Sequence, residues 1–142
     1  MDRCVRLAYR YHDVDLVELA ASAWNGEFGG SARLYIGHGE LADAAERLIG
    51  FPADMADARD VAFGSFGPEF AGGAMVLNFS CIDRAGHCQL QLKLESDPLH
   101  RESQLERVEL IGEVEPAALD RFVEQMRTLN SSLTGSAVLV FA

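Results

Sequence analysis

The stretch MVLNFSCIDRAGHCQLQLKL, residues 75–94, decides the fold. Apolar and polar residues alternate in both of its halves, which is typical of two strands that each bury one face. Only one register brings the two apolar sets together, with a four-residue connection at 83–86. A slip of one residue would set every apolar side chain against a polar row. The stretch therefore predicts an antiparallel hairpin with these cross-strand pairs: Leu77 with Leu92, Phe79 with Leu90, and Cys81 with Cys88.

Alternation of the same kind extends outward from this hairpin. It predicts strands over residues 5–11, 16–24 and 32–36, and Asn25-Gly26 is a strong hairpin signal between the last two. Further short strands are expected over 61–66, 104–114 and 137–141. Strands that follow one another through tight turns form antiparallel sheets.

Two segments have helical periodicity instead. Residues 40–49 place apolar side chains on one face, and Gly50 can take the left-handed conformation that ends a helix before Pro52. A second helix is expected to begin at Pro116, which suits the first helical position, and to end near Asn130. The element order is β-β-β-α-β-β-β-β-α-β. We expect one α+β domain over residues 1–142, an antiparallel sheet of about seven to eight strands with two helices over one face.

The composition is that of an ordinary globular protein, with 49% hydrophobic and 24% charged residues. Twenty-two acids against twelve bases give a formal net charge of −10. A charge of this sign repels nucleic acid and anionic membranes, so neither is expected as a partner, whereas a basic protein is permitted. Asp15 and Glu18 interrupt the stretch that most resembles an export signal, and three cysteines fit a reducing compartment. We therefore expect a cytoplasmic protein.

The acids are concentrated in the C-terminal part of the chain. Nine acids stand against three arginines between residues 95 and 124. On an antiparallel sheet Glu109 and Glu113 would share a solvent face, with Glu95 on a neighbouring strand. One interpretation is a solvated surface that keeps the protein soluble. The other is an electronegative face that docks on a basic protein, where complementary fields speed association and fix orientation.

Candidate chemical sites are few. Residues 37–42, GHGELA, match the G-x-G-x-x-A pattern of dinucleotide-binding folds, but hairpins on both sides favour a strand-to-helix turn. Cys81 and Cys88 are interpreted as reduced core residues, with a cross-strand disulfide and a metal site as the alternatives. The four histidines are scattered over turns and strand ends. We therefore assign no catalytic residue, metal ligand or cofactor.

Several short motifs occur along residues 14–125: Trp24-Asn25-Gly26, Tyr35, Glu40-Leu41, Leu48-Ile49-Gly50-Phe51-Pro52, Phe79-x-x-x-Asp83-x-x-Gly86-His87 and Leu119-Asp120-x-Phe122. Together they resemble a family of small bacterial proteins, some uncharacterised and some labelled immunity proteins to wall-associated polymorphic toxins. The motifs consist mostly of turn and core positions. The resemblance implies a cytoplasmic protein that binds a toxin domain, often a basic nuclease, and blocks it. It implies no catalytic residues.

The leading interpretation is a non-enzymatic binding protein, an inhibitor of the immunity type that docks an acidic face on a basic toxin domain. The binding residues expected on that face are Glu95, Glu109 and Glu113. The alternative is a small-molecule-binding or regulatory α+β domain with a pocket between sheet and helices.

Overall fold

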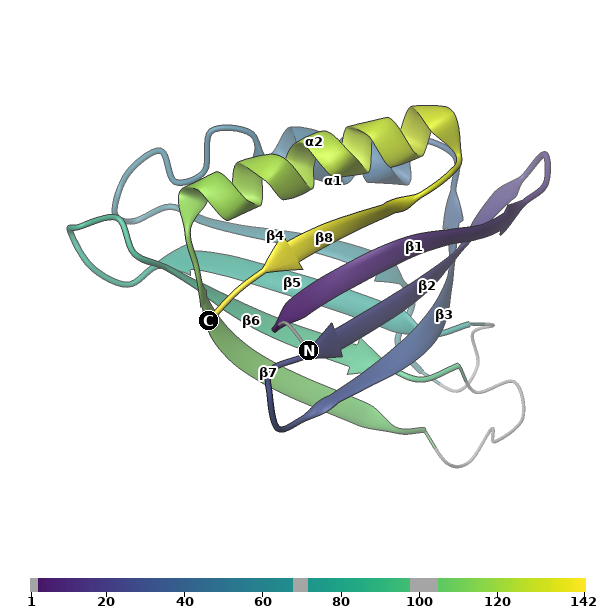
Figure 1. Ribbon diagram of the computed structural model, residues 1–142, viewed down its shortest axis with the longest axis horizontal. Helices are drawn as coiled ribbons and strands as arrows, with labels where there is room; N and C mark the ends of the chain where they lie inside the picture. The colour runs from purple at the N-terminus through teal and green to yellow at the C-terminus, as the bar shows by residue number, and fades with distance from the viewer. Residues whose placement is uncertain (1–2, 68–71, 98–104) are drawn as a thin grey trace.

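The computed structural model of the protein describes residues 3–67, 72–97 and 105–142 (Figure 1). Within these residues the expected α+β class and element order are confirmed. The strands are β1 (Cys4–His12), β2 (Leu16–Trp24), β3 (Gly29–Gly37), β4 (Ala58–Gly64), β5 (Ala74–Cys81), β6 (Cys88–Glu95), β7 (Arg107–Val114) and β8 (Ser136–Val140). The helices are α1 (Glu40–Leu48) and α2 (Pro116–Ser132).

The strands that the structure describes form two four-stranded sheets rather than one. Sheet A has the order β3-β2-β1-β8 and sheet B the order β4-β5-β6-β7, and every neighbouring pair is antiparallel. The division follows from α1, which connects the edge strand β3 of sheet A to the edge strand β4 of sheet B. Two sheets that face each other bury the apolar side chains of both inner faces, which one open sheet cannot do.

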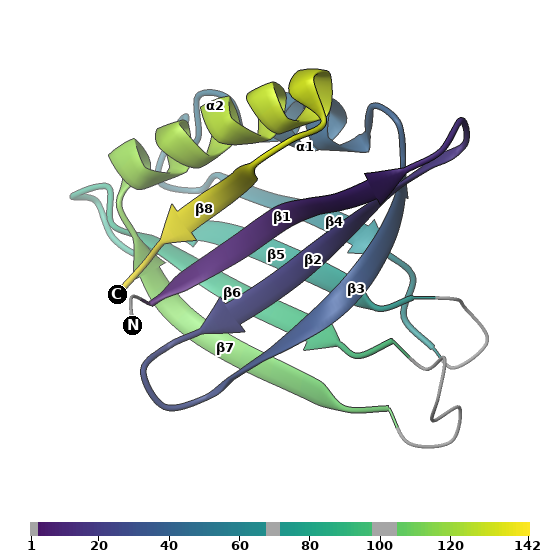
Figure 2. The same cartoon turned by 45° about the vertical axis from the view of Figure 1, so that its right-hand side comes forward.

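The helices occupy the open side between the sheets instead of covering the face of one (Figure 1, Figure 2). α2 packs along β8, α1 packs against β4, and the two helices contact each other. Leu119, Phe122 and Met126 of α2 fill the centre and are at most 1% exposed. Opposite the helices, β3 lies close to sheet B, where the Gly73 N–H donates to the Arg33 carbonyl oxygen (2.6 Å). The helices lie on the open side between the sheets because the inner faces of the two sheets already cover each other.

The hairpin of β5 and β6 has the predicted register, and all three expected pairs are present. Its connection is closed by Asp83, whose side chain accepts the N–H groups of Ala85 (2.9 Å) and His87 (3.3 Å). The Ile82 N–H also donates to the His87 carbonyl oxygen (2.9 Å). Gly86 has a φ of 85°, a conformation that favours glycine. The alternation of the two arms is therefore a reliable guide to pairing here.

Both helix ends have identifiable causes. α1 ends one residue before the expected position, and Gly50 has the predicted left-handed conformation, with a φ of 74°. α2 continues past Asn130, and Leu133, with a φ of 52°, donates its N–H to the Leu129 carbonyl oxygen (3.0 Å). The expectation that Asn130 ends the helix is wrong because its side chain has another role. Its amide oxygen accepts the Ala42 N–H of α1 (3.4 Å).

Strand boundaries differ from the expected ranges by a few residues. β4 covers residues 58–64, whereas the sequence predicts a strand over 61–66. β7 begins at Arg107, and residue 104, where the sequence places its start, lies outside the described residues. These differences do not change which side chains of β7 point inward and which point outward.

Candidate functional site

Three exposed side chains lie in a row on the outer face of sheet B. Glu109, Ile111 and Glu113 alternate along β7 with the buried residues Leu110 and Gly112. Ile111 is 62% exposed. We call Glu109, Ile111 and Glu113 the β7 row. Glu109 and Glu113 thus share a solvent face, as the alternation predicts.

The β7 row lies beside polar residues of β6. Lys93 is opposite Glu109, and Gln89 is opposite Glu113. The Lys93 Nζ lies 3.9 Å from the Glu109 Oε1, so the one lysine of the chain partly neutralises this acid. Among the described residues, no ion pair to Glu113 is found. The face is therefore less electronegative than the number of acids in the sequence suggests, and Glu113 is its less neutralised acid.

Glu95 does not belong to this exposed surface, so the expectation for this residue is wrong. Its side chain is only 2% exposed. One carboxylate oxygen accepts the Gly67 N–H (2.7 Å) and the other accepts the Arg107 Nε–H (2.6 Å). Alternation does place Glu95 on the outer face, opposite Arg107. However, the segment containing Phe66 and Gly67 lies over this end of the sheet, with the Lys93 Nζ 5.4 Å from the Phe66 ring centre.

The surroundings of Glu95 keep it charged. Burial alone would raise the pKa of the carboxyl group. Hydrogen bonds from Arg107 and Gly67, together with the charges of Arg107 and Lys93, outweigh burial and hold the pKa below its ordinary value of 4.5. Glu95 therefore links β6 to β7 and to the segment after β4, and its charge is not available to a docking partner.

Two shallow hollows lie at the two ends of the β7 row, and both include Ile111. The one at Glu113 has a volume of about 390 Å³ and also includes Ile82 and Ala142. Ala142 exchanges backbone hydrogen bonds with Glu113 (2.8 and 2.9 Å), so the last residue covers part of the β7 edge. The hollow at Glu109 has a volume of about 380 Å³ and extends over β5 and β6. Ile111 thus stands between two spaces that a partner side chain could enter.

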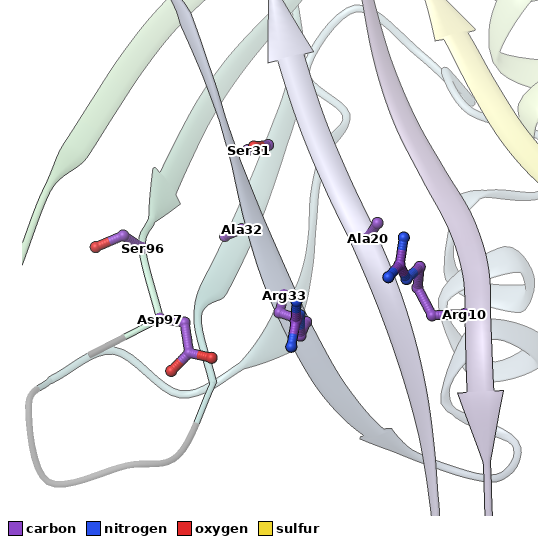
Figure 3. Close-up of a pocket in the computed structure, with 7 residues that line it drawn as sticks. All are labelled: Arg10, Ala20, Ser31, Ala32, Arg33, Ser96 and Asp97. Atoms are coloured by element: carbon purple, nitrogen blue, oxygen red, sulfur yellow. The ribbon is translucent and has the colours of Figure 1, made fainter. Parts of the chain in front are cut away.

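The outer face of sheet A has the opposite charge. Arg6 and Arg10 on β1 and Arg33 on β3 are exposed, and Glu18 on β2 lies between two of them. The Glu18 Oε2 is 4.0 Å from the Arg10 Nε and 3.8 Å from the Arg33 Nε. The sequence alone does not indicate that these arginines share a surface, because the pairing of β1, β2 and β3 brings them to one face. A hollow of about 420 Å³ opens beside them (Figure 3), lined by Arg10, Ala20, Ser31, Ala32, Arg33, Ser96 and Asp97.

The glycine-rich segment before α1 forms a strand-to-helix turn. Gly39 has a φ of 99°, which favours glycine. The Glu40 carboxylate accepts the Gly37 N–H, so a negative charge stands where a dinucleotide-binding fold would hold a pyrophosphate. That fold also needs a parallel sheet, whereas the paired strands here are antiparallel. Both observations support the interpretation as a turn.

The described histidines lie in or beside turns. The His38 Nε2 is 2.7 Å from the Asp13 carbonyl oxygen. His87 pairs with Asp83 across 2.5 Å in the β5–β6 connection, and this hydrogen bond raises the pKa of His87 and lowers that of Asp83. His100 lies outside the described residues. Within the described ranges, no group of three or more His, Cys, Asp or Glu side chains is placed to hold a metal ion.

Cys81 and Cys88 lie directly opposite each other on β5 and β6, as predicted. Both are free thiols, and so is Cys4. Burial, together with the neighbouring Cys81, raises the pKa of the Cys88 thiol to about 11. This thiol is therefore protonated at neutral pH and a poor nucleophile. The pair has the character of a small apolar contact in the core.

No protein-family model, curated protein or solved structure matches this chain. Within the described ranges, no helix is both long and apolar enough to cross a membrane.

Proposed function

We propose that the protein is a non-enzymatic binding protein that docks on a basic partner protein through the β7 row. The observation that carries this proposal is the position of Ile111. This large apolar side chain is 62% exposed and lies between the exposed acids Glu109 and Glu113. The helices lie on the open side of the two sheets and leave the outer face of sheet B uncovered (Figure 1).

The β7 row has the composition of a small interface, an apolar centre with a charged rim. Burying a side chain such as Ile111 against a partner would contribute about 1.5–3 kcal/mol. The hollows at Glu109 and Glu113 offer space for partner side chains. The two acids would act mainly on the rate and orientation of association.

The charge of the protein favours a basic partner. A net charge of −10 sets the sign of the long-range field. Because Lys93 offsets Glu109, Glu113 would carry the larger share of the local contact. The resemblance of the sequence motifs makes a toxin domain the expected partner. The protein would then be an immunity-type inhibitor that acts in the cytoplasm.

The alternative function, small-molecule binding between sheet and helices, has less support. Leu119, Phe122 and Met126 fill the space between the helices and the sheets. The hollows described above lie on the outer faces of the sheets and at their edges instead. Protein binding is therefore the function that the described surfaces favour.

Changing Ile111 to alanine should weaken binding of the partner about tenfold, mainly through faster dissociation, because buried apolar area is lost. Co-expression with the product of the adjacent gene can supply the partner, and surface plasmon resonance measures both rates. Val14→Ala is the matched control, since Val14 is 90% exposed in the turn between β1 and β2. An unchanged dissociation rate for Ile111→Ala would place the contact elsewhere.

Reversing Glu109 and Glu113 to lysine changes the net charge from −10 to −6. Association with the partner should become slower and less dependent on salt, because steering by surface charges is screened over about 8 Å at physiological ionic strength. Reversing Asp120 and Glu124, which are exposed on α2, makes the same charge change at another surface and should have a smaller effect. If the first double variant associates like the wild type at every salt concentration, the acids are only solvated.

A further inference from the structure

The outer face of sheet A carries a positive strip, although the net charge of the protein is −10. We call Arg6, Arg10 and Arg33 the arginine face. We propose that the arginine face binds an acidic segment of a partner protein, whose carboxylates pair with the guanidinium groups. The two sheets face each other, so this surface points away from the β7 row (Figure 2). Binding at the two surfaces can therefore be tested independently.

The strands of the two sheets differ in the sign of their net charge. The strands of sheet A contain Arg6, Arg10 and Arg33 but only one acid, Glu18. All three arginines are exposed, whereas the side chain of Glu18 is 18% exposed. The strands of sheet B contain four acids (Asp60, Glu95, Glu109 and Glu113) against three bases (Arg59, Lys93 and Arg107). The strands of sheet A thus carry an excess of positive charge on their outer face, and Asp97 is the acid that lines the hollow beside Arg10 and Arg33.

The middle strand β2 leaves space between the arginines. Its outward residues Ala20 and Ser22 are small. Ser22 lies opposite Arg6 of β1, and Ala20 lies opposite Arg33 of β3. Long side chains from β1 and β3, the two strands that flank β2, can therefore reach toward one ligand above β2. In Figure 3, Arg10 and Arg33 flank the strand that carries Ala20.

The guanidinium groups are available to a ligand. Among the described residues, Arg6 has no hydrogen bond or ion pair from its guanidinium group. Within the described ranges, the acid that Arg10 and Arg33 approach is Glu18, through Nε atoms at 4.0 and 3.8 Å, which is beyond hydrogen-bond distance. A register shift at residues 9–11 makes Arg10 an extra residue in β1. Such bulges redirect side chains and are frequent beside binding sites.

A short acidic protein segment suits this face better than other anionic occupants. A symmetric dimer through the arginine face would place arginine against arginine, and a head-to-tail contact with another copy would build a ring or an open filament. Nucleic acid carries one negative charge per roughly 1.7 Å of duplex, so a net charge of −10 would repel it along its length. A short segment with a few carboxylates, each paired bidentately with an arginine, contacts the arginine face without extending over the negatively charged remainder of the protein.

A synthetic peptide in which glutamate alternates with glycine provides the probe. Labelled with a fluorophore, it should bind the protein in an anisotropy titration at low salt. Changing Arg6 and Arg33 together to alanine should weaken binding about tenfold for each arginine removed. Lysine at the same two positions should restore only part of the affinity, because an ammonium group cannot pair bidentately with a carboxylate.

The matched control is the double change Arg84→Ala and Arg121→Ala. It removes the same charge from the β5–β6 connection and from the exposed side of α2, and it should leave the affinity nearly unchanged. Circular dichroism checks that both double variants fold. The proposal would be overturned by any of three results: no binding of the wild type at millimolar peptide, an equal loss in the control, or tighter binding of a single-stranded oligonucleotide of the same net charge.

Discussion

Replacing Leu92 with alanine should lower the free energy of unfolding by about 2–5 kcal/mol. Leu92 is 2% exposed and lies between Leu77 on β5 and Leu110 on β7. The substitution removes buried methyl groups and leaves a cavity on the inner face of sheet B. Because this face belongs to one core shared by both sheets and both helices, the cavity can close only in part. Urea titration of the two proteins measures the difference.

Gln91→Ala is the matched control for this prediction. Gln91 is the neighbour of Leu92 on β6 but faces solvent. Its replacement should change the free energy of unfolding by no more than about 0.5 kcal/mol. If Leu92→Ala costs as little as the control, Leu92 does not belong to the core and the assigned register is wrong.

The hairpin of β5 and β6 was predictable because its register depends only on residues close together in the sequence. The polar residues between Met75 and Leu94 alternate with apolar ones, and a period of two leaves one register that matches the apolar sets. The same argument holds for Asn25-Gly26, where Asn25 accepts two backbone N–H groups and Gly26 has a φ of 101°. Turn-forming residues and alternation involve only a few neighbouring positions, so both hairpins can be predicted from the sequence alone.

The division into two sheets was not predictable in the same way. A pattern of alternation reports that a strand has one buried face but not which surface covers it. Here the inner residue Leu34 of β3 and the inner residue Leu92 of β6 belong to one core, although they lie far apart in the sequence. The helices then fill the remaining open side. These are consequences of packing between distant segments, which no local pattern contains.

The candidate site shows the same limit. Alternation correctly places Glu95, Glu109 and Glu113 on one side of sheet B, but it cannot show that the segment containing Gly67 covers Glu95. The lone cation opposite Glu109 also appears only with the register. On sheet A, the arginines come from two strands separated by β2. The charge of a sheet face is therefore a property of strand pairing, and net charge alone misrepresents it.

Replacing Glu95 with glutamine should cost about 1–3 kcal/mol of stability at neutral pH. Glutamine keeps the shape of the side chain and can still accept the Gly67 N–H, but it lacks the charge that binds Arg107. The expected loss lies in the lower part of this range because the Arg107 side chain is 54% exposed and water can replace part of the interaction. Glu124→Gln, at an exposed position of α2, should change stability by no more than about 0.5 kcal/mol.

The pH dependence of this loss distinguishes a charge effect from a shape effect. The fold holds the pKa of Glu95 below its ordinary value of 4.5. A carboxyl group of this kind contributes its stability above the unfolded pKa and loses it as the pH falls through the folded pKa. Wild type and Glu95→Gln should therefore differ by the full amount at neutral pH and converge well below pH 4.5. Urea titrations across this range measure the gap. A gap that stays constant into acid would mean that the charge of Glu95 contributes nothing to the fold.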